Sequence, residues 1–207
     1  MLQLHQLKHE FGSTTLDYPD WSVDKGGHAA ILGNSGSGKT TLLHLIGGLM
    51  KPTSGEVIVD DQSLAKFSGS SLDKFRGKNI GIVFQRPHLV KALSVRENLV
   101  LSQMLGGGSK DSSIVDELLD RLGIGDLKKR KIHQISQGQA QRVSIARALV
   151  NTPKLLLADE PTASLDDASC KKAIELLKDQ ANHFGAALIV ATHDQRVKSE
   201  FENQLTL

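Results

Sequence analysis

Cysteine is almost absent from this chain of 207 residues, and so is net charge. Cys170 is the only cysteine, which excludes an internal disulfide and a cysteine-rich metal site and is typical of a reducing compartment. The 25 basic and 23 acidic residues leave a formal charge of only +2, so no strong field indicates a binder of nucleic acid or of a membrane surface. The one basic run, at 128–131, is interpreted as a solvated loop or helix end.

Long apolar runs are also missing. No stretch approaches the ~20 apolar residues that a membrane-spanning helix needs. Residues 1–8 contain no basic segment followed by a long apolar run, so we expect no secretory signal and a cytoplasmic protein. If the protein serves a membrane, another chain must cross it. The length suits one large domain with an inserted lobe, whereas two independent domains would be cramped.

One stretch, 33–40, has the spacing G-x-x-x-x-G-K-[ST] of a phosphate-binding loop. The apolar run 28–32 before it predicts a buried strand, and apolar residues spaced for one helical face follow it at 42–49. Glycines in such a loop let consecutive backbone N–H groups face an anion, and the helix N-terminus adds positive potential. This context argues against a glycine-rich loop that binds nothing.

The loop predicts a nucleoside triphosphate as ligand. Lys39 would contact the β- and γ-phosphates, and the Thr40 hydroxyl would be a ligand of a Mg²⁺ ion that bridges them. The candidate nucleotide-binding residues of this segment are Gly33, Asn34, Ser35, Gly36, Ser37, Gly38, Lys39, Thr40 and Thr41. The motif does not say what the energy of the nucleotide is used for.

The rest of the chain begins and ends with strand-like patterns. Alternating apolar residues at 2–7 and the segment 14–18 predict an antiparallel pair at the edge of the fold. Further strands are predicted at 56–60, 80–84, 154–158 and 187–191. The continuous apolar runs of the last two are typical of parallel strands that are covered on both faces.

Between 94 and 150 the pattern is helical. Ser94 with Glu97, and Ser136 with Gln139, have the spacing of reciprocal capping boxes at two helix starts. A helical lobe inserted into a sheet-based domain is the simplest account. The predicted fold is therefore α/β, with a mainly parallel sheet, an antiparallel β edge and an inserted helical part.

Polar side chains follow three of the predicted buried strands. They are Gln85, then Asp159 with Glu160, then Thr192 with His193. Ligands of open parallel sheets bind at the carboxyl ends of the strands, so we expect these side chains to converge beside the phosphate loop. Polar strand ends are common, so Gln85 or His193 alone would mean little, and only their joint arrangement with the acidic pair carries the prediction.

The convergence assigns a role to each group. Asp159 would hold the magnesium hydration shell opposite Thr40, and Glu160 would orient or polarise an attacking water. Gln85 would complete the magnesium shell or hold the water. His193 would donate a hydrogen bond to the γ-phosphate and stabilise charge in the transition state. The alternative for the acidic pair is a solvated strand end.

A second candidate anion site lies at 135–139, where a serine hydroxyl and a glycine N–H meet a predicted helix N-terminus. The alternative is an ordinary helix cap.

Together these segments resemble the ATP-binding subunit of an ABC transporter over nearly the whole chain. The matching motifs are the phosphate loop 33–40, Gln85 as the glutamine loop, 135–139 as the signature, 155–161 as the Walker B strand, Ser164, Leu165 and Asp166 as the D-loop, and His193 as the switch histidine.

The resemblance implies one ABC-type ATPase domain with a P-loop NTPase core. Residues 1–90 and 151–207 would form the core with its β edge, and about 91–150 the helical subdomain. It implies ATP and Mg²⁺ as cofactors. Phe11 falls where the family stacks an aromatic ring on adenine, although a plain core phenylalanine is the alternative.

The resemblance also implies an assembly. The signature of one subunit, here Ser136, Gln137, Gly138 and Gln139, closes over the ATP held by a second copy or a homologous ATPase subunit, in a head-to-tail dimer. The partner would be a transmembrane permease, received near 88–90, which places the protein at the inner face of the cell membrane.

Segments 41–49 and 52–55 most resemble the lipoprotein-releasing and macrolide-export branch. That branch usually lacks a C-terminal regulatory domain, and this chain stops at Leu207. Gln137 stands where the family usually has the first of two glycines, a change expected to alter closure more than to abolish activity. Gly27 and Pro19 also depart from the family pattern, which leaves the pairing of the first strands open.

We therefore predict an ATPase subunit that powers a membrane transporter. One alternative is the same cycle used to switch a membrane partner without transport. A soluble ABC-type ATPase acting on DNA or ribosomes would require coiled-coil or zinc insertions or a second ATPase domain, which the chain lacks. A kinase of small molecules would leave the signature without a purpose.

Overall fold

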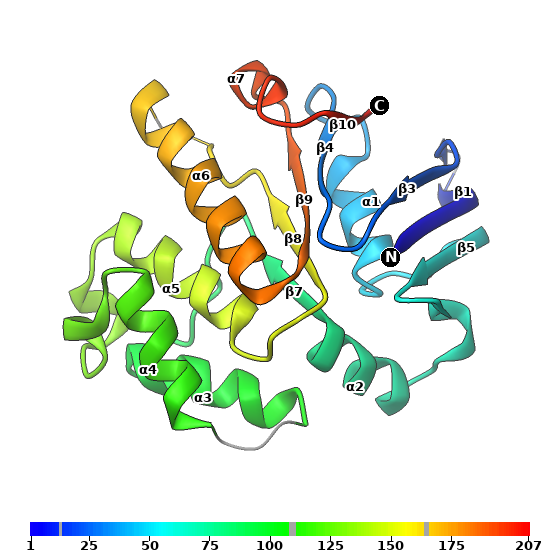
Figure 1. The fold of residues 1–207 in the computed structure, drawn as a ribbon. Helices are drawn as coiled ribbons and strands as arrows, with labels where there is room; N and C mark the ends of the chain where they lie inside the picture. Colours follow the sequence, from blue (N-terminus) through cyan, green and yellow to red (C-terminus); the bar gives the residue numbers. More distant parts are fainter. Residues whose placement is uncertain (13, 108–110, 164–165) are drawn as a thin grey trace.

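The computed structural model describes residues 1–12, 14–107, 111–163 and 166–207 (Figure 1). The strands are β1 (Leu2–Phe11), β2 (Thr14–Asp17), β3 (Trp21–Val23), β4 (His28–Leu32), β5 (Ser54–Val59), β6 (Gln62–Ser63), β7 (Ile80–Val83), β8 (Leu155–Asp159), β9 (Ala187–Thr192) and β10 (Asn203–Thr206). The helices are α1 (Lys39–Ile46), α2 (Ser70–Asn79), α3 (Val95–Leu105), α4 (Ser112–Arg121), α5 (Gln137–Leu149), α6 (Asp167–Phe184) and α7 (Gln195–Lys198), with short 3₁₀ turns at Leu64–Lys66, Gly125–Leu127 and Ile132–Gln134.

The central sheet is parallel, in the order β10-β4-β9-β8-β7. Every residue of β8 and β9 is buried, because helices and a second sheet cover the two faces. Side chains alternate between these faces: Leu156 and Ala158 pack with α5 and α6, whereas Leu155 and Leu157 pack with α1. The continuous apolar runs in the sequence therefore reflect burial on both sides.

The second sheet is antiparallel, in the order β2-β1-β5-β6, with β3 also paired to β1. The pair predicted at 2–7 and 14–18 is confirmed, with Lys8 opposite Asp17. Pro19 lies between β2 and β3, which pair with opposite ends of β1. The strand predicted at 56–60 runs from Ser54 to Val59 and belongs to this sheet.

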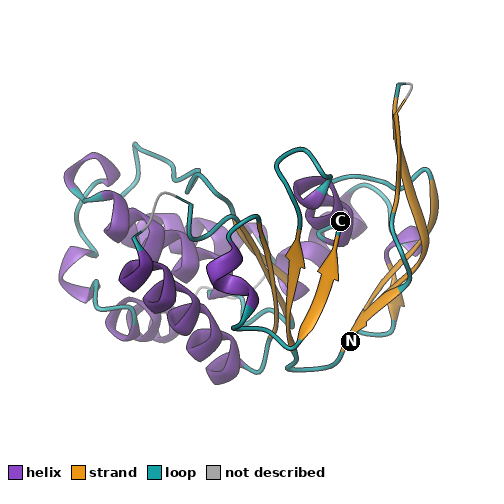
Figure 2. Cartoon of the chain, turned by 90° about the horizontal axis from the view of Figure 1, so that it is seen from above, coloured by secondary structure: helices purple, strands orange, loops and turns teal. Residues whose placement is uncertain are grey.

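Helix α1 lies between the two sheets and packs against both (Figure 1). Its buried residues Leu42, Leu43, Leu45 and Ile46 fill the space between them. Viewed from above, α3, α4, α5 and α6 gather on the opposite side of the parallel sheet (Figure 2), whereas Phe75 of α2 packs in the same cluster as α1. The α/β architecture predicted from the sequence is confirmed.

The helical layer contacts the parallel sheet very closely at one position. A Cβ on Gly81 of β7 would lie 2.2 Å from the carbonyl oxygen of Ala148 in α5, so only glycine permits this approach. Helix α5 carries Ser136 at its N-terminus, and the close packing fixes the direction in which that end points. None of the described helices is long and apolar enough to cross a membrane.

Both predicted capping boxes are present. The Ser94 hydroxyl accepts the Glu97 N–H at 3.2 Å, and the Ser94 N–H donates to the Glu97 carboxylate at 2.6 Å. The Ser136 hydroxyl accepts the Gln139 N–H at 3.2 Å, and the Ser136 N–H donates to the Gln139 side-chain oxygen at 2.9 Å. These bonds satisfy N–H groups that the first turns of α3 and α5 would leave unpaired.

Ser94→Ala is expected to lower the free energy of unfolding by about 1 kcal/mol, because it removes the acceptor of the Glu97 N–H. Denaturant unfolding measures the difference. The control is Ser199→Ala, since Ser199 is exposed and makes no side-chain hydrogen bond within the described ranges. Its effect should stay within about 0.5 kcal/mol. Equal stability of Ser94→Ala and the unmodified protein would contradict the capping role.

Candidate functional site

An open cleft of about 490 Å³ lies where the phosphate loop meets the carboxyl edge of the parallel sheet. Its lining residues are Phe11, Thr14, Leu16, Ser35, Gly36, Gly38, Lys39, Thr40, Thr41, Gln85, Glu160 and His193. Gln85 follows β7, Glu160 follows β8 and His193 follows β9, so the structure brings the three strand ends to one place. Asp159 lies just behind the lining, hydrogen-bonded to Thr40.

The loop backbone depends on two glycines. Gly36 and Gly38 have φ angles of 82° and 97°, in the left-handed region that residues with a Cβ rarely adopt. Gly38 is the N-cap of α1, so the chain turns from the loop directly into the helix. The loop N–H groups and the α1 N-terminus together form a partial positive charge suited to phosphate.

Lys39 is buried at the centre of the loop, with 6% of its side chain exposed. Its ammonium donates hydrogen bonds of 2.9 Å to the carbonyl oxygens of Gly33 and Asn34. It also lies 3.7 Å from the carboxylate of Glu160. The loop thus holds the Lys39 ammonium at the floor of the cleft, and the two carbonyl groups compensate the cost of burying its charge.

Thr40 and Asp159 form a pair of oxygen donors beside Lys39. The Thr40 hydroxyl is 3.0 Å and 3.2 Å from the two carboxylate oxygens of Asp159. Burial raises the pKa of the Asp159 carboxyl, while the Thr40 hydrogen bond opposes this shift. A metal cation bound nearby would favour the ionised form of the Asp159 carboxyl and so offset the cost of burying its charge.

This donor set fits Mg²⁺, which prefers hard oxygen ligands and usually keeps several waters. Within the described residues, no group of three or more His, Cys, Asp or Glu side chains could hold a metal. An ion bound by Thr40 and Asp159 would therefore take its other ligands from water, phosphate or the amide of Gln85.

Glu160 is held from several directions. Its carboxylate accepts hydrogen bonds from the Thr192 hydroxyl at 3.0 Å and from the His193 N–H at 3.2 Å. The His193 ring nitrogen Nδ1 lies 2.8 Å from the same carboxylate. An ionised carboxylate has no hydrogen to donate, so in this pair Nδ1 is the donor. Glu160 has a φ of 46°, which is strained for a residue with a Cβ. The surrounding bonds stabilise this strained position.

Tyr18 is a contributor that the sequence analysis did not single out. Its hydroxyl donates a 3.1 Å hydrogen bond to the carbonyl oxygen of Gly38, and the side chain is 3% exposed. Burial raises the pKa of Tyr18 to about 12, so the phenol stays protonated as a donor. No motif marks this residue, because its contact arises from the fold of the β2–β3 connection against the loop.

Phe11 projects into the cleft from the end of β1. Its side chain is 49% exposed, which is not the environment of a core residue. The ring of His9 meets it edge-on, with ring centroids 4.5 Å apart. An exposed aromatic face at the mouth of a phosphate cleft can stack on a planar base.

The predicted signature lies outside this cleft. Ser136, Gln137 and Gly138 are exposed at the N-terminus of α5, and Ser136 caps the helix. A Cβ on Gly138 would meet nothing within 4 Å. The helix-cap interpretation is thus correct within the chain, and the N–H groups of Gln137 and Gly138, which the capping box does not use, remain open to a ligand from outside it.

The predicted D-loop is only partly described. Ser164 and Leu165 lie outside the described residues. Asp166 is the N-cap of α6 and accepts the Ser169 N–H at 2.8 Å.

The family model of ABC transporters matches residues 16–163. The chain belongs to the ABC transporter family. Relatives over nearly its full length agree: the "Lipoprotein-releasing system ATP-binding protein LolD" of Shewanella frigidimarina is 39% identical over 98% of this chain and 87% of its own length. The protein of the same name from Legionella pneumophila is 38% identical over 99% of this chain and 92% of its own length.

Solved ABC cassettes share the fold. A dimeric post-hydrolysis structure of an ATP-binding cassette bound to ADP and Pi has a TM-score of 0.87 and 33% identity, covering 100% of this chain and 94% of the other. A cassette from Clostridium perfringens, part of the ABC transporter complex cbiONQ, has a TM-score of 0.88 and 34% identity, covering 99% and 83%. This chain is an ABC-type ATPase subunit, and the predicted family, fold and enzyme class are confirmed.

Asp159→Asn is expected to make the nucleotide-free ABC subunit more stable near pH 7. Because the pKa of Asp159 is raised in the folded state, folding binds protons, and stability falls as pH rises from the unfolded value of 3.8 through the folded value. The variant lacks this cost. Its advantage should shrink as pH falls through the same window.

Thermal unfolding of both proteins between pH 4 and 7 measures this difference. Asp24→Asn is the control, since Asp24 is exposed, and it should change stability by less than about 0.5 kcal/mol. A loss of stability in Asp159→Asn at pH 7 would show that the Thr40 hydrogen bond outweighs the burial of the charge.

Proposed function

We propose that this ATPase drives a membrane-embedded partner through closure and reopening of a head-to-tail dimer. The observation that carries the proposal is the separation of two complementary sites. The cleft contains the Lys39 ammonium, the oxygen donors of Thr40 and Asp159 and the oriented carboxylate of Glu160. The signature at the start of α5 is exposed and lies outside this cleft. A second copy of the chain, or a homologous ATPase subunit, would bring a signature to each cleft.

Within the cleft, Lys39 and the loop N–H groups bind the phosphates of ATP and neutralise their charge. Mg²⁺ held by Thr40 and Asp159, with Gln85 able to complete its ligand set, would stabilise negative charge on the β- and γ-phosphates. Phe11 stacks on the adenine. The positions of these residues around one cleft support these roles.

Glu160 acts on the attacking water. Its carboxylate is 12% exposed and oriented by Thr192 and His193. It accepts a hydrogen bond from the water and takes its proton as the water oxygen bonds to the γ-phosphorus and the bond from that phosphorus to the bridging oxygen of ADP breaks, which releases ADP and phosphate. His193 donates its Nδ1–H to Glu160, and its side chain lines the cleft in which the γ-phosphate would lie. Together they couple the water to the phosphate that it attacks.

The signature completes the site in trans. Ser136 supplies a hydroxyl, Gly138 an unobstructed N–H, and α5 the positive end of its dipole. Gln137 and Gln139 flank them, and Ser164 to Asp166 act as the D-loop. We further propose that 91–150 is the helical subdomain that carries the signature, within a single domain spanning 1–207.

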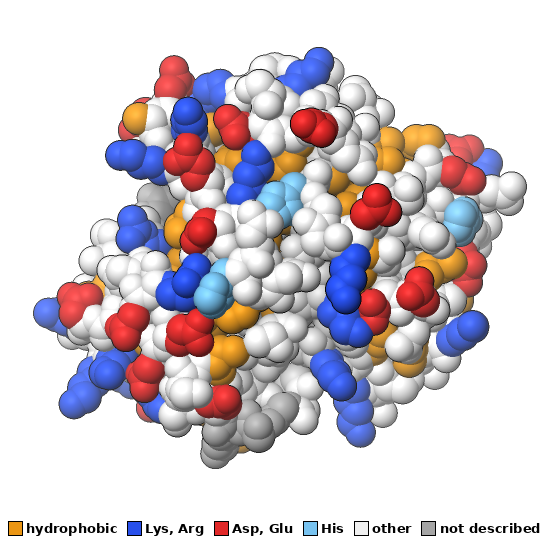
Figure 3. Space-filling view, in the orientation of Figure 1, with side chains coloured by type: hydrophobic (Ala, Val, Ile, Leu, Met, Phe, Trp, Pro, Cys, Tyr) orange, Lys and Arg blue, Asp and Glu red, His pale blue; other side chains and the backbone are white. Residues whose placement is uncertain are grey.

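The membrane partner is proposed to contact the segment after Gln85. Val90 is 42% exposed there, and the carbonyl oxygen of His88 is fixed by a 2.7 Å hydrogen bond from Arg147. The relatives named for lipoprotein release favour a permease of that kind, with this subunit peripheral at the cytoplasmic face. Acidic and basic side chains are mixed over the face shown in Figure 3, so this face carries no field of one sign that would favour nucleic acid.

Glu160→Gln is expected to lower ATP turnover at least about 100-fold, since the amide cannot accept the proton of the water. ATP binding should persist, because Lys39 and the loop are intact, and an ATP-bound dimer should accumulate. Phosphate release, nucleotide binding and size-exclusion chromatography measure the three effects.

Glu175→Gln serves as control, since Glu175 lies on α6 and pairs only with Lys171 at 4.0 Å among the described residues. It should leave turnover unchanged. Full steady-state hydrolysis by Glu160→Gln would sink the assignment.

A further inference from the structure

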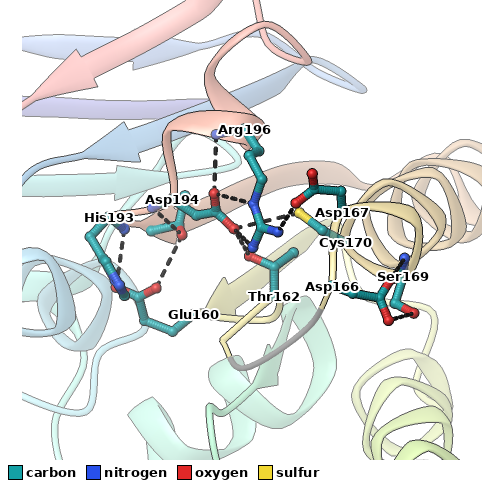
Figure 4. A network of polar contacts seen from close by, with 10 residues as sticks. Glu160, Thr162, Asp166, Asp167, Ser169, Cys170, His193, Asp194 and Arg196 are labelled. Atoms are coloured by element: carbon teal, nitrogen blue, oxygen red, sulfur yellow. Dashed lines mark hydrogen bonds and ion pairs between the residues drawn. The ribbon is translucent and has the colours of Figure 1, made fainter.

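A chain of hydrogen bonds leads from Glu160 away from the cleft (Figure 4). The Thr192 hydroxyl donates to Glu160 at 3.0 Å and accepts the Asp194 N–H at 3.0 Å. The conformation of the 192–194 segment therefore determines where Glu160 finds two of its donors, the Thr192 hydroxyl and the His193 N–H.

Asp194 is in turn held by Arg196. The guanidinium donates to both carboxylate oxygens, at 2.8 Å and 2.7 Å, and the Arg196 N–H donates at 3.0 Å. The Thr162 hydroxyl adds a bond of 3.2 Å. The hydrogen bonds from Arg196 hold the pKa of Asp194 well below its usual range, so the carboxylate stays ionised at neutral pH. A bidentate pair of this kind fixes geometry as well as charge.

Arg196 also reaches a second element. Its Nη1 lies 2.5 Å from the carboxylate of Asp167, the first residue of α6. One guanidinium therefore ties the segment after β9 to the start of α6, directly after the N-cap Asp166. Neither Arg196 nor Asp167 lines the cleft, so neither touches ATP directly.

We propose that Arg196 is a positioning residue for ATP hydrolysis, acting through Asp194 and Thr192 on Glu160. The inference rests on the proposed role of Glu160. A strained backbone at φ 46° persists only where surrounding contacts hold it, and Arg196 anchors the segment that provides them. A small displacement of a catalytic carboxylate is expensive in rate, about 100-fold for 1 Å.

The exposure of the partners differs between the two ion pairs of Arg196. The Arg196 side chain is 41% exposed and Asp167 is 91% exposed, so their ion pair is screened by solvent and contributes little to folding. Asp194 is only 14% exposed, so removal of Arg196 also leaves a largely buried carboxylate without its main partner and lowers the stability of the fold. Kinetics are therefore compared where every variant is folded: the turnover number should fall, whereas the affinity for ATP should change little because the phosphate contacts come from the loop at 33–40.

The test compares Arg196→Ala, Asp167→Ala, the double variant and the control Lys171→Ala in the full chain. Arg196→Ala should lower kcat about tenfold with the Kd for ATP within about twofold. Asp167→Ala should lower kcat less, and the double variant should match Arg196→Ala, because both changes break one linkage. Lys171→Ala, on the same helix but outside the network, should leave kcat unchanged.

Hydrogen exchange gives a readout that does not depend on turnover. The N–H groups of His193 and Asp194 are bonded to Glu160 and Thr192, so they should exchange about tenfold faster in Arg196→Ala, while those of α1 do not change. Unchanged exchange at 193 and 194, unchanged kcat, or an equal loss of ATP affinity would overturn the proposal. If Glu160→Gln hydrolyses ATP normally, the proposed function fails, and exchange still decides whether Arg196 anchors this segment.

Discussion

The parallel register of β4, β9 and β8 is the constraint on which the cleft depends. Ile31 pairs with Ala191, and Ala191 pairs with Asp159, so these strands end at one level. This alignment brings the Lys39 ammonium within 3.7 Å of Glu160, a residue far along the chain. Slipping one of these strands by a residue would turn the side chains of that strand to the other face of the sheet.

The charges gathered at this edge oppose folding and favour ligand binding. Asp159 is 7% exposed, Lys39 6% and Glu160 12%, so two carboxylates and one ammonium are withdrawn from water together. Hydrogen bonds compensate the cost in part. The raised pKa of Asp159 reflects the part of this cost that the hydrogen bonds do not compensate. A cation between the carboxylate and a phosphate would relieve this cost, which couples binding to stability of the folded state.

The sequence predicted what depends on local pattern. The phosphate loop, the buried strands and the capping boxes at Ser94 and Ser136 follow from spacing over a few residues. The contact of Tyr18 with Gly38 and the bridge from Arg196 to Asp167 do not, because each joins segments 20 or 29 residues apart whose approach is set by packing. Polar residues that act through a neighbour carry no motif of their own.

The exposed start of α5 lies outside the cleft that Lys39 and Glu160 line. Ser136 and Gly138 are exposed, so a single copy explains their cap but not a ligand. Gln137 is the first residue of α5, so its helix propensity affects the conformation of this end. Glycine within a helix costs about 0.5–1 kcal/mol more than alanine in lost backbone freedom, a cost that glutamine largely avoids. This chain therefore favours the helical conformation at the start of α5 without a partner, so the N–H groups of Gln137 and Gly138 keep one arrangement relative to the Ser136 hydroxyl.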